Sequence, residues 1–576
     1  MFKLFKYMKG PAVIFALISP FMMLIEVTMD LMQPKLLSDI IDIGVAKRDI
    51  SFIFFTGIKM ISAALFGFIG GAGCAVFSSA ASMNMGEKLR QTLFDKIQTL
   101  SFADIDKFKT SSIITRLTND VTQVQNMIIM ALRGAIRAPF LCLGGIVMAA
   151  SLSKNLSIIF LAAVPMVLIA VIIVLKKSFP LFSALQEKID AVNTVMRESI
   201  LGIRVIKVFT LEDKQREKFD GVNYDLTNSS IQAQNMNMIL WPIVTLIMNI
   251  SVIAVLWFGG NMVNNGTLQI GKIMAFINYL LQIMHSLILF VMIVLNFTRA
   301  KASANRINEI LDCVPSIQNL EDSKEVNSFD IEFKNVSFKY NAHSDNVLTD
   351  ISVKINQGEN VGIIGTTGSG KSSLVSLIPR LYDVTEGQVL IGGIDVKNIS
   401  LKQLRENIGV VLQDSILFSG TIEENIMFGN EHADFQTMEA VSIDAQAYEF
   451  IMEKENGYKS IVEQRGKNLS GGQKQRINIA RTLIRNPRIL ILDDSTSALD
   501  MATEAKVQNS INKRMVQSTV IIIAQRISAV MNADKIIVMD KGRICHVGTH
   551  KDLLNNCEIY KSIAAAQLGE EAAVNG

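Results

Sequence analysis

The residues with the clearest chemistry form a glycine-rich loop between an expected strand and an expected helix. The apolar stretch 360–364 predicts the strand, and the pattern GxxxxGKS follows it directly. The loop consists of Gly365, Thr366, Thr367, Gly368, Ser369, Gly370, Lys371 and Ser372, with Ser373 after it. The glycines let backbone N–H groups approach a phosphate, Lys371 can neutralise β- and γ-phosphates, and the Ser372 hydroxyl can bind Mg²⁺. The pattern therefore predicts a nucleotide-phosphate site.

A second expected strand, 488–493, ends in a carboxylate. Its sequence is Arg-Ile-Leu-Ile-Leu-Asp, and Asp493 at its end would hold Mg²⁺ directly or through a water molecule. An apolar strand that ends in aspartate is weak evidence for a nucleotide site by itself, but it becomes stronger evidence because the phosphate loop lies upstream in the same chain. Together the two motifs predict a site for ATP and Mg²⁺.

A third motif lies between the first two and can also bind an anion. It consists of Leu469, Ser470, Gly471, Gly472 and Gln473, just before a helix expected over 475–485. Backbone N–H groups and the helix dipole at such a helix start favour negative charge, so this is a second phosphate site. Because one domain cannot easily fold both sites onto one nucleotide, we expect the chain to dimerise.

Composition divides the chain into two parts. Of its 576 residues 49% are hydrophobic and 19% are charged, and the mean hydropathy is +0.33. Long uncharged runs occupy the first 300 residues, whereas the remainder has the composition of a soluble α/β domain. The net charge of +3 is too small to indicate nucleic-acid binding. The five cysteines are scattered without metal-binding spacing, which suggests free thiols.

The apolar runs are long enough to cross a membrane, which takes about 20 residues each. We predict six spans, near 11–33, 53–80, 134–153, 156–175, 237–262 and 272–297. Lys and Arg concentrate in the two long connections, 84–130 and 177–235, and the short connections carry few. By the positive-inside rule the long connections and both chain ends are cytoplasmic.

The predicted fold is therefore an α-helical six-span transmembrane domain fused to an α/β P-loop domain. We place the transmembrane domain at 1–305, a linker at 306–328 and the nucleotide-binding domain at 329–576. The protein is expected to be a multi-pass protein of the cell membrane, in contact with lipid, with its nucleotide-binding domain in the cytoplasm.

Two carboxylates lie within the first span. Glu26 and Asp30 are four residues apart, so they share one face of the helix. Charge inside a bilayer is costly and faces a cavity or a partner. The pair is either a candidate substrate cavity for a cation or coupling ion, or a structural pair with a neighbouring helix. Methionine is abundant, with 28 residues, and serves either as a deformable binding surface or as apolar filler.

With these motifs on one chain, the sequence resembles an ABC exporter half-transporter over nearly its whole length. The resemblance implies that Tyr340 stacks on adenine and that 469–473 is the ABC signature. It also implies that Gln413 is the Q-loop glutamine, a catalytic residue and a ligand of Mg²⁺. It further implies a D-loop that consists of Ser497, Ala498, Leu499 and Asp500. Residues 108–121 and 202–219 resemble the first and second intracellular loops of exporters.

The sequence departs from the family pattern at two catalytic positions. Asp494 stands where the family has the glutamate that aligns the attacking water, and Gln525 stands where it has the switch histidine. Aspartate is one methylene shorter, and an amide cannot become cationic or relay a proton. The two changes beside an intact P-loop and signature resemble the degenerate-site subunit of heterodimeric ABC exporters. A homodimer with slow Asp-assisted hydrolysis is the alternative.

The resemblance implies ATP-driven export with a second, different half-transporter as partner. The substrate is a small molecule, a lipid or a peptide, and is expected to be amphipathic or hydrophobic. Two further hypotheses remain open, namely an exporter-fold importer of a metal-chelating siderophore and a regulatory ABC protein that gates a partner without pumping. No nucleic-acid partner is expected.

Overall fold

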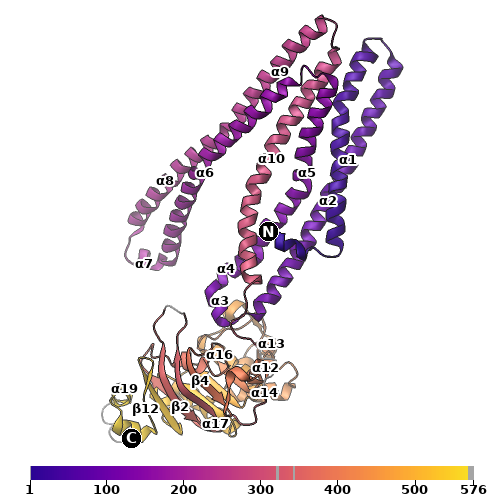
Figure 1. The fold of residues 1–576 in the computed structure, drawn as a ribbon. Helices are drawn as coiled ribbons and strands as arrows, with labels where there is room; N and C mark the ends of the chain where they lie inside the picture. Colours follow the sequence, from indigo (N-terminus) through magenta and orange to yellow (C-terminus); the bar gives the residue numbers. More distant parts are fainter. Residues whose placement is uncertain (1, 319–323, 342–343, 569–576) are drawn as a thin grey trace. The chain divides into compact units, whose positions relative to one another are not determined.

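The chain folds into two units, each described here by itself. The computed structural model describes residues 2–318, 324–341 and 344–568 (Figure 1). One unit comprises 1–98 and 110–313, and the other comprises 99–109 and 314–576. The predicted boundary at 305 falls inside a helix, α10 (Ile270–Leu311), so the first part of the predicted linker is helical. The short segment 99–109 belongs to the second unit although its neighbours in sequence belong to the first.

The first unit is built of long helices. After η1 (Phe2–Tyr7), these are α1 (Pro11–Asp39) with its extension η2 (Ile40–Val45), α2 (Ile50–Thr99), α4 (Thr110–Thr115), η3 (Arg116–Asp120), α5 (Val121–Leu152), α6 (Ile158–Leu201), α7 (Ile203–Val208), α8 (Glu212–Met238), α9 (Leu240–Asn264) and α10. Among the described residues, six helical segments of 35 to 53 residues are long and apolar enough to cross a membrane. The prediction of six spans is confirmed.

The long helices pack in two groups that share α10. Helix α10 lies along α5 and also contacts α1 and α9, while α6 lies along α8 and α9 (Figure 1). A buried cluster joins α5, α6, α9 and α10, and in it the rings of Phe160 and Phe276 stack with centroids 4.8 Å apart. Because a bilayer core accommodates only about 20 helical residues, helices of this length continue beyond the membrane.

The second unit contains two main sheets. The six-stranded sheet has the order β12-β11-β3-β10-β9-β6, in which β12 is antiparallel to β11 and the other pairings are parallel. Its strands are β3 (Asn360–Gly365), β6 (Ile408–Val411), β9 (Ile489–Asp493), β10 (Thr519–Ile523), β11 (Lys535–Asp540) and β12 (Arg543–Gly548). All five residues of β9 and of β10 are buried, as expected of central parallel strands covered on both faces.

The second unit also contains a smaller sheet, a short strand pair and several helices. A four-stranded sheet has the order β2-β1-β4-β5, with β1 (Ile331–Phe338), β2 (Leu348–Ile355), β4 (Glu386–Ile391) and β5 (Ile394–Asp395). A short pair joins β7 (Gly420–Thr421) to β8 (Ile461–Val462). The helices include α3 (Phe102–Phe108), α11 (Lys371–Ser376), α12 (Leu401–Asn407), α13 (Ile422–Met427), α14 (Phe435–Asp444), α15 (Tyr448–Met452), α16 (Gly471–Leu483), α17 (Met501–Arg514), α18 (His550–Asn556) and α19 (Glu558–Leu568).

Candidate functional site

The glycine-rich loop joins β3 to α11, as the sequence predicts. Gly368 and Gly370 have φ of 81° and 93°, which side-chain-bearing residues rarely adopt, so the glycines are required by the turn itself. The Lys371 ammonium lies over the loop and donates to the carbonyl oxygens of Gly365 and Thr366 at 3.0 and 2.9 Å. The cation is therefore positioned at the loop that would wrap the phosphates.

Two of the three predicted magnesium ligands, Ser372 and Asp493, meet at the carboxyl end of the parallel sheet. Strands β3 and β9 flank β10, so the loop after β3 and the end of β9 lie at the same edge. The Ser372 hydroxyl donates to the Asp493 carboxylate at 2.9 Å. A hydroxyl and a carboxylate are the hard oxygen donors that Mg²⁺ prefers, so these residues fit the ion.

The two unusual residues, Asp494 and Gln525, contact each other. The Gln525 amide nitrogen donates to Asp494 Oδ2 at 2.9 Å, and the Gln413 amide nitrogen donates to the same oxygen at 3.4 Å. Asp494 has φ of 47°, and its backbone N–H donates to the carbonyl of Ile523 on β10. The three residues named from the sequence as catalytic thus form one hydrogen-bonded group.

Burial shifts the proton affinities of the charged groups at this site. It raises the pKa of Asp493 and of Asp494, and the nearby Lys371 ammonium lowers both but does not cancel the rise. Burial also lowers the pKa of Lys371, against the opposing effect of the two carboxylates. Each shift follows from removing charge from water, so the site contains charges that a phosphate and a cation would help to neutralise.

Tyr340, the residue expected to stack on adenine, lies at the rim of the loop. The residue is 43% exposed, and its hydroxyl is 2.8 Å from Ser373 Oγ. Tyr382 packs edge-on against the ring with centroids 5.2 Å apart. The ring is therefore held in place with part of its surface open to a ligand.

Residues 470–472 of the signature and 498–500 of the D-loop line a single cavity of about 340 Å³, together with Arg476 and Thr503. Helix α16 begins at Gly471, earlier than predicted, so Ser470 is its N-cap. Ser470 Oγ accepts a hydrogen bond from the Gln473 N–H, and Gln473 Oε1 accepts one from the Ser470 N–H. Gln475 ties this helix to the D-loop by accepting from the Ala498 N–H at 3.0 Å and donating to Ser497 Oγ at 3.3 Å.

The expected first intracellular loop is tied to the last long helix. Arg116 donates to the carbonyl oxygen of Arg306 at 2.6 Å and pairs with Glu309 at 2.9 Å, while Arg306 donates to the buried Asp120 at 2.8 Å. All three contacts connect η3 to α10. The end of the last span and the loop therefore form one rigid corner.

The tip of that loop, α3, packs within the second unit. Asp104 accepts from the Ser101 hydroxyl at 2.7 Å and from the Ser316 N–H at 3.1 Å. Burial raises the pKa of Asp104, but these bonds outweigh it and hold the pKa below its usual value. Tyr382 OH donates to Asp106 at 2.8 Å. The loop tip is thus joined to the domain that carries the phosphate loop.

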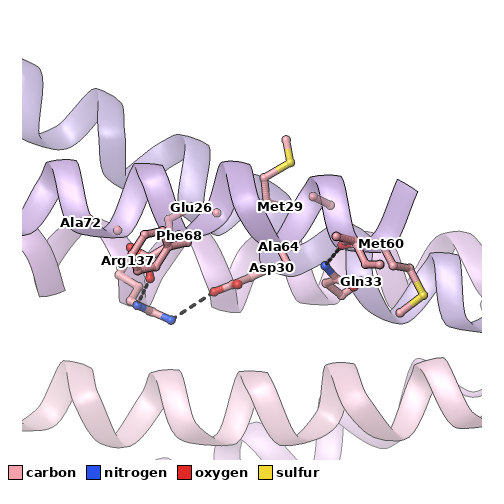
Figure 2. Close-up of a pocket in the computed structure, with 13 residues that line it drawn as sticks. Glu26, Met29, Asp30, Gln33, Met60, Ala64, Phe68, Ala72 and Arg137 are labelled. Carbon is pink, nitrogen blue, oxygen red and sulfur yellow. Dashed lines mark hydrogen bonds and ion pairs between the residues drawn. The ribbon is translucent and has the colours of Figure 1, made fainter. Parts of the chain in front are cut away.

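The two carboxylates of the first span have a cationic partner that the sequence analysis did not identify. Arg137 of α5 lies between them in Figure 2 and donates to Glu26 and, at 3.1 Å, to Asp30. The signal was an arginine within a predicted span, complementary to acids on another span. All three residues line a cavity of about 670 Å³ between α1 and α2. The acidic pair therefore has a partner on a neighbouring helix, as the structural interpretation expects, and substrate binding at the cavity stays a prediction.

Two family descriptions match the chain. Residues 16–287 match the family described as ABC transporter transmembrane region, and residues 348–497 match the one described as ABC transporter. The first covers the long helices, and the second covers the phosphate loop, the signature and the end of β9.

Several curated proteins are similar along most of the chain. The ABC transporter ATP-binding protein YfiB of Bacillus subtilis is 39% identical over 564 residues, which cover 98% of each chain. A second B. subtilis protein, YgaD, with the provisional name of multidrug export ATP-binding/permease protein, is 35% identical and covers 83% of each chain. A solved structure of a bacterial Atm1-family ABC exporter with ATP bound has a TM-score of 0.81, covers 96% of this chain and 98% of its own, and is 24% identical.

Proposed function

Because this chain belongs to the ABC transporter family, as a half-transporter with its transmembrane and ATPase domains on one polypeptide, we propose that it forms one half of a heterodimeric exporter. It is a multi-pass membrane protein with an ATPase domain in the cytoplasm, and it is an ATP-hydrolysing transport enzyme of exporter fold. In the proposed complex its own P-loop site binds ATP and turns it over slowly, while its signature serves a faster site on a different partner chain.

The observation that carries this proposal is the group formed by Asp494, Gln525 and Gln413. Asp494 Oδ2 accepts from both amides, so the carboxylate that would orient the attacking water is drawn toward two neutral donors. Aspartate also holds its carboxylate about 1.5 Å closer to the backbone than glutamate does. Misplacement on that scale costs on the order of 10²-fold in rate.

The geometry of the residues that we propose bind ATP supports the first part of the proposal. Lys371 would neutralise phosphate charge, Ser372 and Asp493 would hold Mg²⁺, and Tyr340 would support the adenine. Mg²⁺, when bound, would shield the phosphate charges. The same chain therefore holds nucleotide through residues that are intact and orients water through residues that are altered.

The signature cavity supports the second part of the proposal. Its N-cap is complete, and Gln475 fixes it against the D-loop. Such a helix start can hold the γ-phosphate of an ATP bound to another chain. Exposed apolar side chains on α7, among them Val205 and Val208, are consistent with docking of the second intracellular loop on that chain.

Transport would follow closure of the two ATPase domains around ATP. The corner of Arg116, Asp120 and Arg306 would transmit this motion to α10. We expect the substrate to be amphipathic or hydrophobic, in line with the mixture of apolar and charged side chains that line the cavities between the spans.

The proposal is tested by the composition of the purified complex and by the fate of its nucleotides. We expect the tagged chain to recover a different half-transporter at 1:1 from its native membrane. After slow turnover, trapped nucleotide on this chain's Lys371 loop should be mainly ATP. A homodimer with full substrate-stimulated ATPase activity, or equal ADP at both sites, would contradict it.

A further inference from the structure

The cavity between α1 and α2 has the size and walls of a small-molecule site. Its volume of about 670 Å³ lies within the usual range for ligand pockets, roughly 300 to 1,000 Å³. Its walls combine small residues such as Ala64 and Ala72 with the larger Met29, Met60 and Phe68 (Figure 2). Thioethers adapt to different shapes, and an aromatic face attracts cations.

The charged groups in this cavity are unbalanced. Glu26 and Asp30 supply two carboxylates and Arg137 supplies one guanidinium, which bonds to both. Glu26 is the better-enclosed acid: its side chain is 15% exposed, compared with 37% for Asp30. A Cβ on Gly71 would lie 2.9 Å from Glu26 Oε2, so the absence of a side chain at Gly71 leaves room for this carboxylate against α2. Asp30 is thus the acid that remains accessible.

The other guanidinium nearby, that of Arg133, does not line this cavity, so the charged residues that do are two carboxylates and one guanidinium. Arg133 lines a neighbouring cavity of about 470 Å³, but its guanidinium donates to Ser78 Oγ at 2.6 Å and to the carbonyl of Ala75 at 2.7 Å. Arg137 lines both cavities and is held by the two acids. A ligand entering the larger cavity therefore meets excess negative charge.

We propose that this cavity binds a monovalent amphipathic organic cation, whose charged group replaces Arg137 as the partner of Asp30. The inference rests on the proposed export function and names its substrate class. The apolar body of the ligand packs against Met29, Met60 and Phe68. Its positive charge neutralises Asp30, and Arg137 remains bonded to Glu26. Arg137 therefore competes with the ligand for Asp30.

The test uses two organic ions of nearly equal size and opposite charge, tetraphenylphosphonium and tetraphenylborate. Each is titrated by equilibrium dialysis onto the full-length transporter in lipid nanodiscs without nucleotide. We expect saturable binding of the cation only. Asp30→Asn should weaken it by about tenfold, because the cavity becomes neutral. Asp39→Asn changes a carboxylate of the same helix that does not line the cavity, and should leave binding unchanged.

Arg137→Gln distinguishes a ligand site from a purely structural ion pair. Removal of the competitor should tighten cation binding at least threefold, whereas a structural pair gives no gain. Equal binding of both ions by the unmodified protein, or unchanged cation affinity in Asp30→Asn, would overturn the proposal. Because no nucleotide or transport is involved, a failure of the heterodimer or export proposals leaves these results interpretable: cation binding that persists without export supports the site alone.

Discussion

The two phosphate-binding regions of the ATPase unit differ in how completely they are built. At the P-loop, the residues that we propose bind ATP follow the family pattern, whereas Asp494 and Gln525 stand where the family has glutamate and histidine, and they bond to each other. At the signature, Ser470 caps α16 and Gln475 locks it to the D-loop. The difference implies that binding and hydrolysis depend on separate groups, so a chain can lose one while it supplies the other to a partner.

The largest expected effect comes from placing a negative charge in the signature. Gly471→Asp should lower steady-state ATPase activity of the heterodimer by on the order of 10²-fold or more. An acid in the first turn favours the helix, so folding should not suffer. Gly471→Ala is the steric control: its Cβ would meet Ala498 Cβ at an ordinary 3.4 Å. If Gly471→Asp kept most of its activity, this signature would not serve the competent site.

The next effect concerns retention of nucleotide at the P-loop. Lys371→Met removes the ammonium over the loop and should reduce labelling of this chain by 8-azido-ATP by about tenfold or more. Total turnover should fall less than in Gly471→Asp, because the faster site keeps its own lysine. Lys402→Met, at an exposed position on α12, is the matched control. A larger loss of turnover for Lys371→Met than for Gly471→Asp would reverse the proposed roles.

A smaller effect is expected from restoring the family residues. Asp494→Glu and Gln525→His should each change ATPase activity by less than about tenfold, because several groups stabilise the transition state together. The double variant should exceed the product of the single effects, since the two side chains share a hydrogen bond of 2.9 Å. A double-mutant cycle measures this coupling. A gain well above tenfold from Asp494→Glu alone would place the whole defect in one residue.

The smallest effect separates helix capping from phosphate binding. Thr549 caps α18 with the same reciprocal geometry as Ser470 caps α16. Ser470→Ala and Thr549→Ala should each lower the free energy of unfolding by about 1 kcal/mol, as read by pulse proteolysis in urea. Only Ser470→Ala should also reduce turnover, by severalfold. Equal turnover in both variants would reduce Ser470 to a structural cap.

The sequence alone determined the parts that depend on local pattern. Six apolar runs predicted six spans because a bilayer requires about 20 apolar residues in each, and the structure confirms them. The phosphate loop was predictable because its glycines are needed by the turn, as the positive φ of Gly368 and Gly370 shows. The helix after the signature was predicted too late because Gly471 and Gly472 have low helix propensity, which the Ser470 cap outweighs.

Only the tertiary structure decided which distant residues meet. No periodicity in the sequence joins Arg137 to Glu26 and Asp30, or Asp104 to Ser316, because these contacts depend on the packing of separate helices and loops. The same holds for Asp494 and Gln525: their types mark a departure from the family, but their shared hydrogen bond follows from the parallel pairing of β9 with β10. Local sequence patterns determine the helices and strands, whereas burial and strand pairing across the fold determine which residues each charged side chain contacts.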